Sequence, residues 1–299
     1  MRGLPTPLAA LAALFMLTPS VAPAVEGPMR IVSLNPCLDA LLVELVARDR
    51  IAAISHYSRD PWRSTITDIA RTLPITHETA EEVVALKPDL VLVGRHSAIA
   101  TRTALGRVGI RFELFDVPMS IAASHEQVRH LARLLHVQER GEALIARIDA
   151  AIRAARPDKS VTPLTAAVYQ PGGLTAGKAT ITDELMRNVG VDNVPAHYNI
   201  RQHRPIALED LLQSPPDILL VGATTEAAAT HAERIVHHRA LRALGHRMTK
   251  MEYPARLLYC AGPTMIHALD ALVAARDRTL QLRHAQRDTP LVSTLRSAQ

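Results

Sequence analysis

The chain has 299 residues, 48% of them hydrophobic, so it is long enough for one large or two ordinary domains and apolar enough to fill their cores. Its formal net charge is +5, but no long block of Lys and Arg occurs and only 3% of the residues are aromatic, so we expect no nucleic-acid partner. Two cysteines alone, Cys37 and Cys260, exclude a disulfide-dense scaffold and a cysteine-rich metal site.

The amino terminus has the order of a cleavable secretory signal. Arg2 precedes an apolar run, Leu8–Leu17, and a stretch of small residues ends at Ala24. The run has about ten residues, roughly half of what a bilayer core requires. We therefore expect residues 1–24 to be a signal peptide and the rest of the chain to be exported as a soluble protein.

Short runs rich in β-branched residues and leucine alternate with helical patterns after the signal, as in a parallel sheet with crossover helices. The predicted strands are Arg30–Leu34, Ile51–Ser55, Leu90–Val93 and Phe112–Phe115. The predicted helices are Cys37–Ala47, Thr79–Leu86 and Ala98–Val108. Together they predict an N-terminal lobe over residues 25–135.

Apolar residues then recur at helical spacing from Ser120 to about Ala155, and Gly141 is the only interior residue that would weaken a helix. The pattern predicts one long helix, with a shorter helix ahead of it as the alternative. Turn residues from Pro157 onward end the pattern. We place the helix that connects the two halves of the protein at residues 136–157.

The alternation of strands and helices resumes beyond the connecting helix and predicts a C-terminal lobe over residues 158–285, followed by a flexible polar tail at 286–299. The predicted strands are Thr165–Tyr169, Ile218–Val221 and Met248–Tyr253. The predicted helices are Asp183–Val189, Leu208–Leu212, Ala232–Leu244 and Thr264–Ala275.

Two segments, Glu81–Gly94 and Glu209–Gly222, nearly repeat each other. Each begins with two acidic residues, predicts a short helix that stops at Pro-Asp, and continues into a buried strand. The repeat indicates two similar halves. We therefore expect an α/β fold of two Rossmann-like lobes, each with a mainly parallel sheet, joined by one long helix.

Two motifs resemble catalytic sites but lack essential features. The glycine-rich segment Gly172–Lys178 is followed by Ala179, where a phosphate-binding loop needs a hydroxyl to hold magnesium. His125 and His130 are five residues apart, a spacing that puts them on different sides of a helix. A Gly-x-Ser-x-Gly elbow is missing from the sequence. We predict that the protein is not an enzyme and has no cofactor or metal site of its own.

Four phrases, in this order along the chain, resemble motifs of the periplasmic binding proteins for ferric siderophores, haem and cobalamin. They are Arg30–Pro36, Ala85–Val91, Thr175–Lys178 and Asn188–Val194. The resemblance implies a monomeric solute-binding protein of an ABC importer, located in the periplasm, that captures a metal chelate and delivers it to a permease dimer of the inner membrane. A ferric siderophore is the first choice of cargo, and cobalamin or haem comes next.

A second class of function stays open, namely a secreted two-lobed α/β enzyme or chelatase that acts on a metal tetrapyrrole or a siderophore. Such an enzyme needs an acid/base pair in its cleft, for example His56 with Asp60 or Glu113. The fold alone does not decide between the two classes. Stoichiometric recovery of unchanged chelate would favour the binding protein, and turnover would favour the enzyme.

Open α/β sheets bind ligands outside the carboxyl ends of their strands. Arginines suit the anionic oxygens of a chelate, and aromatic rings suit its flat apolar surface. The predicted ligand-binding residues are Asn35, Tyr57, Arg59, Trp62, Arg95, Gly173, Arg201, Arg204, Arg256 and Tyr259. Each arginine and Trp62 has a structural alternative, solvated or packed, and Asn35 and Gly173 have one as turn residues. The two cysteines are unpaired, bridge the lobes or touch cargo.

The resemblance also implies one exposed glutamate per lobe that pairs with arginine on each copy of the permease. The repeat assigns these roles to Glu81 and Glu209, with Glu82 and Asp210 as the neighbouring alternatives. Acidic residues at helix starts are also favoured by the helix dipole alone, which is the structural alternative.

Overall fold

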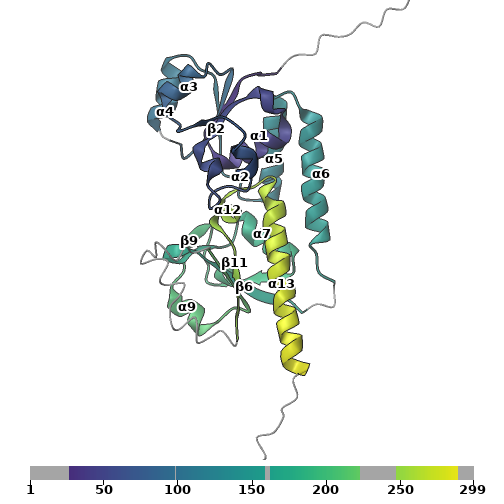
Figure 1. The fold of residues 1–299 in the computed structure, drawn as a ribbon. Helices are drawn as coiled ribbons and strands as arrows, with labels where there is room; N and C mark the ends of the chain where they lie inside the picture. Colours follow the sequence, from purple (N-terminus) through teal and green to yellow (C-terminus); the bar gives the residue numbers. More distant parts are fainter. Residues whose placement is uncertain (1–26, 98, 159–161, 223–246, 289–299) are drawn as a thin grey trace, which may run out of the picture.

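The computed structural model describes residues 27–97, 99–158, 162–222 and 247–288. Two α/β lobes lie one above the other, and helix α6 (Gln138–Ala154) carries the chain along one side from the first lobe to the second (Figure 1). Within these ranges, no helix is long and apolar enough to cross a membrane. The predicted signal peptide and the predicted helix Ala232–Leu244 lie outside the described residues.

The N-terminal lobe contains a five-stranded parallel sheet in the order β3-β2-β1-β4-β5. Its strands are β1 (Ile31–Ser33), β2 (Ile51–Ser55), β3 (Ile75–Thr76), β4 (Leu90–Gly94) and β5 (Phe112–Phe115). Its helices are α1 (Pro36–Leu45), α2 (Thr67–Ala70), α3 (Ala80–Ala85) and α4 (Ile99–Arg107). Both β1 and β4 are fully buried, since helices cover the sheet on its two faces.

The C-terminal lobe contains a four-stranded parallel sheet in the order β11-β10-β6-β8, and a separate antiparallel ribbon of two strands. The sheet strands are β6 (Leu164–Tyr169), β8 (Val191–Asn193), β10 (Ile218–Val221) and β11 (Thr249–Glu252), and the ribbon strands are β7 (Leu174–Ala176) and β9 (His203–Pro205). The helices are α7 (Ile181–Asn188), α8 (Val194–His197), α9 (Leu208–Gln213), α12 (Ala255–Tyr259) and α13 (Thr264–Asp288). Helix α13 continues past Ala275 into the predicted tail.

The two lobes share one strand order, because β2-β1-β4-β5 in the first corresponds to β8-β6-β10-β11 in the second. The aspartates of the repeated Pro-Asp pairs have matching contacts. Asp89 Oδ2 accepts the backbone N–H groups of Met29 (2.9 Å) and Arg30 (2.8 Å) before β1, and Asp217 Oδ2 accepts that of Thr165 (2.8 Å) in β6. The predicted fold class, two Rossmann-like α/β lobes, is confirmed.

The long helical pattern between the lobes forms two helices instead of one. Helix α5 (Ile121–Leu134) and helix α6 pack side by side, and His136, with φ of 57°, lies in the turn between them. The prediction of a single helix is therefore wrong, and its alternative is correct. Gly141 does not interrupt α6: an added Cβ would lie 2.6 Å from Cβ of Ala132, so this glycine allows the two helices to approach closely.

The hydrophobic core is continuous from one lobe to the other. A single cluster of buried side chains includes Leu41 of α1, Leu131 of α5, Ile148 of α6 and Leu269 of α13. Burial of such side chains contributes roughly 1.5–3 kcal/mol each. The lobes are consequently packed against a shared set of helices and are not two bodies on a loose linker.

Candidate functional site

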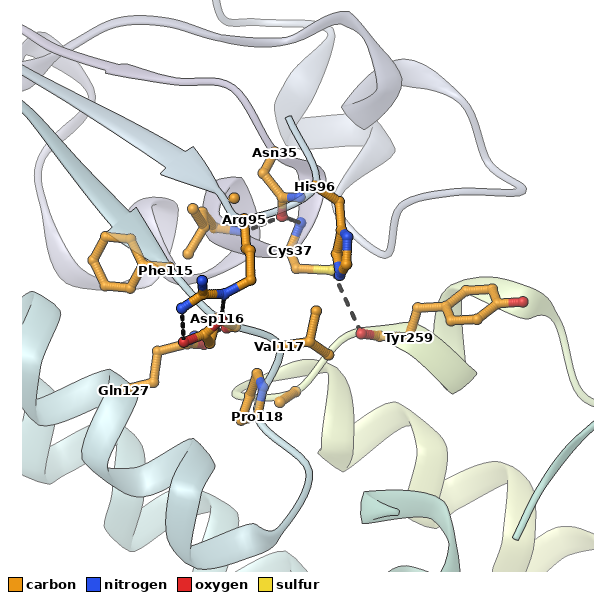
Figure 2. A pocket seen from close by; sticks show the side chains of 13 residues that line it. Asn35, Cys37, Arg95, His96, Phe115, Asp116, Val117, Pro118, Gln127 and Tyr259 are labelled. Carbon is orange, nitrogen blue, oxygen red and sulfur yellow. Dashed lines mark hydrogen bonds and ion pairs between the residues drawn. The ribbon is translucent and has the colours of Figure 1, made fainter. Parts of the chain in front are cut away.

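Residues of both lobes meet in one pocket. Asn35 follows β1, Arg95 follows β4 and Asp116 follows β5, while the C-terminal lobe contributes Tyr259 and Ala261 (Figure 2). The pocket therefore lies between the lobes, at the carboxyl edge of the N-terminal sheet, which is where open α/β sheets bind ligands.

Two of the predicted ligand residues also have structural roles, one as a helix cap and one in a turn. Asn35 is the N-cap of α1, since its Oδ1 accepts the N–H groups of Cys37 (2.9 Å) and Leu38 (3.2 Å). Gly173 is buried, with φ of 77°, in the turn before β7. Asn35 thus lines the pocket with its amide oxygen already engaged.

Two of the predicted cationic ligands in the N-terminal lobe have partners within the lobe. Arg59 donates from Nε to the carbonyl oxygen of Ala70 (3.1 Å) and from Nη2 to that of Leu73 (2.8 Å). Arg95 forms an ion pair with Asp116 at the pocket wall, and both side chains are more than half exposed. A chelate would have to compete with these contacts for either guanidinium.

The three predicted arginines of the C-terminal lobe differ in their contacts. Arg256 crosses to the other lobe, where its Nη1 donates to the carbonyl oxygen of Pro61 at 2.7 Å. Arg201 and Arg204 are exposed at the β7–β9 ribbon, and the described residues provide no hydrogen bond or ion pair to either guanidinium. Of the five predicted arginines, these two are the ones whose guanidinium groups no described residue engages, so they are available to an anionic ligand.

Aromatic side chains are exposed in both lobes, and of the two predicted ligands with the most exposed rings, Tyr259 lines the pocket and Trp62 does not. Trp62 is 43% exposed in the N-terminal lobe, and Tyr259 is 45% exposed in the C-terminal lobe. The ring of Tyr259 lies 5.9 Å from that of His203 on β9. Burial raises the pKa of Tyr259 and lowers the pKa of His203, so a neutral phenol and a neutral imidazole are favoured there at pH 7.

Tyr57 belongs to a group of rings that the sequence did not fully reveal. Its ring centroid lies 3.9 Å from that of His56, and His56 lies 4.9 Å from His77. The guanidinium of Arg63 lies 4.6 Å from the centroid of Tyr57. Sequence reasoning missed His77 because it follows β3, a strand of two residues that leaves no pattern. In the described part of the chain, no group of three or more His, Cys, Asp or Glu side chains is arranged to hold a metal ion.

A buried carboxyl group supports the loop that carries Tyr57. Asp39 of α1 is fully buried, and its Oδ2 accepts the N–H of Ser55 (3.0 Å) and the hydroxyl of Ser58 (2.6 Å). Burial holds the pKa of Asp39 well above its usual value, despite these hydrogen bonds. Asp39 therefore holds the chain on both sides of Tyr57 from inside the core, and its own side chain does not reach the cleft.

The paired acids of the repeat lie in the first turns of α3 and α9. Glu81 and Glu209 are both exposed, and no side-chain partner is present for either within the described ranges. Glu82 differs, because its Oε2 accepts the hydroxyl of Thr76 (2.8 Å) and the N–H of His77 (2.6 Å), contacts that lower its pKa. Of the two neighbours in α3, Glu81 is the one free to meet a partner.

Comparisons with known proteins agree with this architecture. Residues 31–245 match the model of a family described as periplasmic binding protein. A cobalamin-binding protein of Halobacterium salinarum is 28% identical over 214 residues, which make up 70% of this chain and 58% of the relative. The chain thus spans less than two thirds of the length of that curated relative.

Solved structures share the fold at lower identity. A periplasmic haem-binding protein from Roseiflexus sp. RS-1, in its apo form, gives a TM-score of 0.70 at 23% identity and covers 85% of this chain and 99% of its own. An ABC-type Fe³⁺-hydroxamate transport system protein from Saccharomonospora viridis gives 0.63 at 20% identity, covering 84% and 94%. At these identities the likeness is one of fold.

Proposed function

Because the chain belongs to the periplasmic binding protein family, we propose that it is the solute-binding protein of an ABC importer, that it works in the periplasm, and that it delivers a metal chelate to an inner-membrane permease. The observation that carries the proposal is the pocket between the two lobes, lined by residues that follow β1, β4 and β5 in the N-terminal lobe and by Tyr259 and Ala261, at and after the end of α12, in the C-terminal lobe. Such a pocket encloses a small molecule from two sides.

The exposed side chains of the two lobes favour a chelate with anionic groups and a flat apolar surface, although of the ten predicted ligand residues only Asn35, Arg95 and Tyr259 line the pocket itself. Exposed Trp62 and Tyr259 offer ring faces, and Arg201 and Arg204 offer guanidinium groups without protein partners among the described residues. Relatives that carry cobalamin or haem in their names add weight to these two cargoes, beside the ferric siderophore first expected.

Calorimetric titration of the purified protein with haemin, cyanocobalamin and a set of ferric siderophores tests this proposal. We expect stoichiometric binding of one class, with the chelate recovered unchanged after denaturation of the protein. Failure of every chelate to bind would reject the proposal.

The enzyme alternative has less support in the contacts of its proposed acid/base residues. Glu113 is hydrogen bonded to His130 (2.7 Å), and Asp60 lies 3.2 Å from Arg63. His56 makes no hydrogen bond to either acid, and its Nδ1 is without a partner in the described structure. Turnover of a bound chelate would nevertheless favour the enzyme over the binding protein.

Docking on the permease is proposed to use Glu81 and Glu209, one from each lobe. Equivalent positions in the two lobes suit a permease made of two like subunits, and exposed charges of this kind steer association and orientation. In reconstituted vesicles, Glu81→Arg with Glu209→Arg should abolish stimulation of the transporter's ATPase and leave cargo affinity unchanged. Glu139→Arg, at an exposed acid in the first turn of α6, is the matched control. Normal stimulation by the double variant would reject this assignment.

A further inference from the structure

A disulfide joins the two lobes beside the pocket. Cys37 lies in the first turn of α1, directly after the central strand β1, and Cys260 follows α12 in the other lobe. Their Cα atoms are 5.1 Å apart, although 223 residues separate them in the sequence. The carbonyl oxygen of Tyr259 lies 3.8 Å from Sγ of Cys37 (Figure 2). Of the three alternatives left open by the sequence, the structure has the bridge between the lobes.

Other contacts hold the same part of the C-terminal lobe against the N-terminal lobe. Arg256 donates to the carbonyl oxygen of Pro61 at 2.7 Å, and the N–H of Gly262 donates to the buried Oγ of Ser124 at 2.9 Å. Gly262 has φ of 61°, and an added Cβ would lie 2.7 Å from Cδ2 of Leu41. Only glycine lets the backbone lie this close in this conformation.

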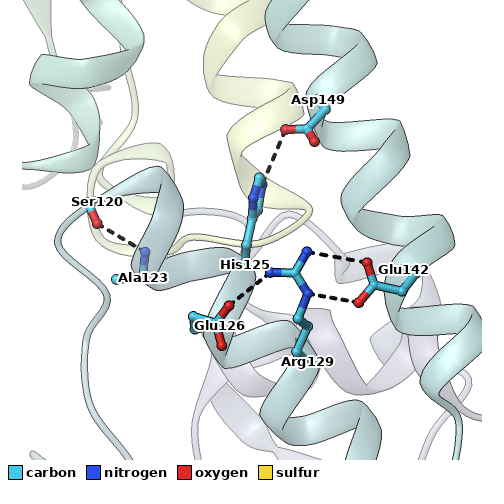
Figure 3. Close-up of polar contacts among 7 residues, drawn as sticks. All are labelled: Ser120, Ala123, His125, Glu126, Arg129, Glu142 and Asp149. Carbon is cyan, nitrogen blue, oxygen red and sulfur yellow. Dashed lines mark hydrogen bonds and ion pairs between the residues drawn. The ribbon is translucent and has the colours of Figure 1, made fainter.

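The lobes are therefore joined covalently at two places. One is the chain itself, which passes through α6. This helix is fastened to α5 by Arg129, which donates to Glu142 at 2.8 Å, and His125 Nε2 lies 3.5 Å from Asp149 (Figure 3). The other is the disulfide. The shared core of α6 and α13 already limits movement between the lobes, and the disulfide adds a covalent restraint at the cleft itself.

We infer that the disulfide and residues 255–264, here called the clasp segment, set the spacing of the cleft walls before cargo arrives. The inference rests on the proposed function, because it concerns affinity for cargo in that cleft. Tyr259 belongs to the clasp segment and lines the pocket, and its backbone carbonyl lies next to Cys37, so the disulfide holds the backbone of this wall residue in position. Walls already held at their bound spacing lose less conformational freedom on binding, which raises affinity.

The first test compares the wild-type protein with Cys37→Ser/Cys260→Ser in calorimetric titrations with haemin and cyanocobalamin. For the probe that the wild type binds, we expect the dissociation constant of the double variant to rise about tenfold, which corresponds to about 1.4 kcal/mol. Arg256→Ala should have a smaller effect, because the disulfide remains. Leu272→Ala, which truncates a buried side chain of α13 outside the pocket, controls for a general loss of stability.

The second test needs no cargo. Amide hydrogen exchange of the apo protein is measured before and after reduction by the phosphine TCEP, which gives two electrons to the disulfide and leaves, with water, two thiols and the phosphine oxide. Exchange should quicken in the clasp segment and stay unchanged in β6 and β10. Reduced wild-type protein, freed of TCEP under nitrogen and titrated likewise, replaces the serine variant if that variant does not fold.

The outcomes separate the inference from the proposed function. Equal affinities with and without the disulfide, or unchanged exchange on reduction, would overturn the clasp. If the wild type binds no chelate at all, the proposed function fails, and the exchange measurement alone decides whether the disulfide restrains the clasp segment.

Discussion

The two lobes have the same strand order but use their cations differently. In the N-terminal lobe, Arg59 is bound to backbone carbonyls and Arg95 to Asp116. In the C-terminal lobe, Arg256 donates to the carbonyl oxygen of Pro61, but Arg201 and Arg204 are exposed and lack side-chain partners in the part of the chain that the structure describes. Topology therefore decides which residues border the cleft, whereas local partners decide which of them are free to bind.

The largest expected effect concerns the aspartates of the repeat. Asp217 accepts a hydrogen bond from the N–H of Thr165 and forms an ion pair with Arg283. It is also less exposed than Asp89. We expect Asp217→Ala to lower the free energy of unfolding by about 2–3 kcal/mol and Asp89→Ala by about half as much, because hydrogen bonds to charged groups weaken with exposure. Urea denaturation measures both free energies of unfolding, and Asp217→Asn and Asp89→Asn, which remove the charge but keep the size of the side chain, are the controls. A larger loss for Asp89→Ala would reverse this comparison.

The difference in available cations gives the next prediction. Arg201→Ala or Arg204→Ala should weaken binding of an anionic chelate by about 1.5–3 kcal/mol wherever the guanidinium contacts it. Arg59→Ala should instead lower stability and leave affinity within about twofold, since its donors serve Ala70 and Leu73. Calorimetric titration and thermal unfolding separate the two effects, and Arg→Lys variants control for charge. If Arg59→Ala weakened binding and neither Arg201→Ala nor Arg204→Ala did, the proposed difference between the lobes would be wrong.

A smaller effect on the free energy of unfolding is expected from two buried aspartates, Asp39 in α1 and Asp183 in α7. Asp183 of α7 is paired with Arg187 (3.1 Å), whereas Asp39 of α1 has no cationic partner among the described residues and a pKa raised by burial. The stabilising contribution of Asp39 is thus complete below its unfolded pKa and is lost as pH rises through its folded pKa. Asp39→Asn should gain stability relative to the wild type as pH increases from 5 to 8.

Urea denaturation across that pH range checks this prediction. Using the difference between variant and wild type cancels the opposite contributions of Glu82 and Glu142, whose pKa values are lowered. Asp183→Asn is the matched change in the C-terminal lobe and should only destabilise, because it removes the charge that pairs with Arg187. A constant difference between Asp39→Asn and the wild type would contradict the assignment.

The smallest expected change is in overall shape. Both lobes share a core with α6 and α13, and α6 has neither proline nor paired glycines at which a helix bends sharply. Cargo should therefore leave the radius of gyration from X-ray scattering unchanged within error. A marked decrease would mean that the lobes close on each other like a wide clamshell.

Much of the fold could be predicted because buried runs between breakers mark parallel strands. Ile51–Ser55, Phe112–Phe115 and Ile218–Val221 are strands over the predicted residues. The β3 strand and the β7–β9 ribbon were missed, since two or three residues are too few to show alternation. The division of the long helical pattern depended on His136, and a positive φ at histidine has no clear signal in sequence.

The candidate site was harder to predict, because the partners of its side chains are distant in sequence. Arg95 pairs with Asp116, and Arg256 bonds to Pro61, which lies 195 residues away. Neither pairing can be inferred from spacing along the chain. The cysteines are a similar case, since strand ends in opposite lobes allowed a bridge without requiring one.

The bond between Cys37 and Cys260 also makes most of the polypeptide a ring, from which only the two ends of the chain extend. Closing a ring of this size lowers the conformational entropy of the unfolded chain, which raises its free energy by about 5 kcal/mol. A ring has a further property: one cut by a protease anywhere inside it opens the ring without dividing the molecule. The two pieces stay attached through sulfur, so a nicked copy keeps both walls of its cleft together until a second cut or a reductant separates them.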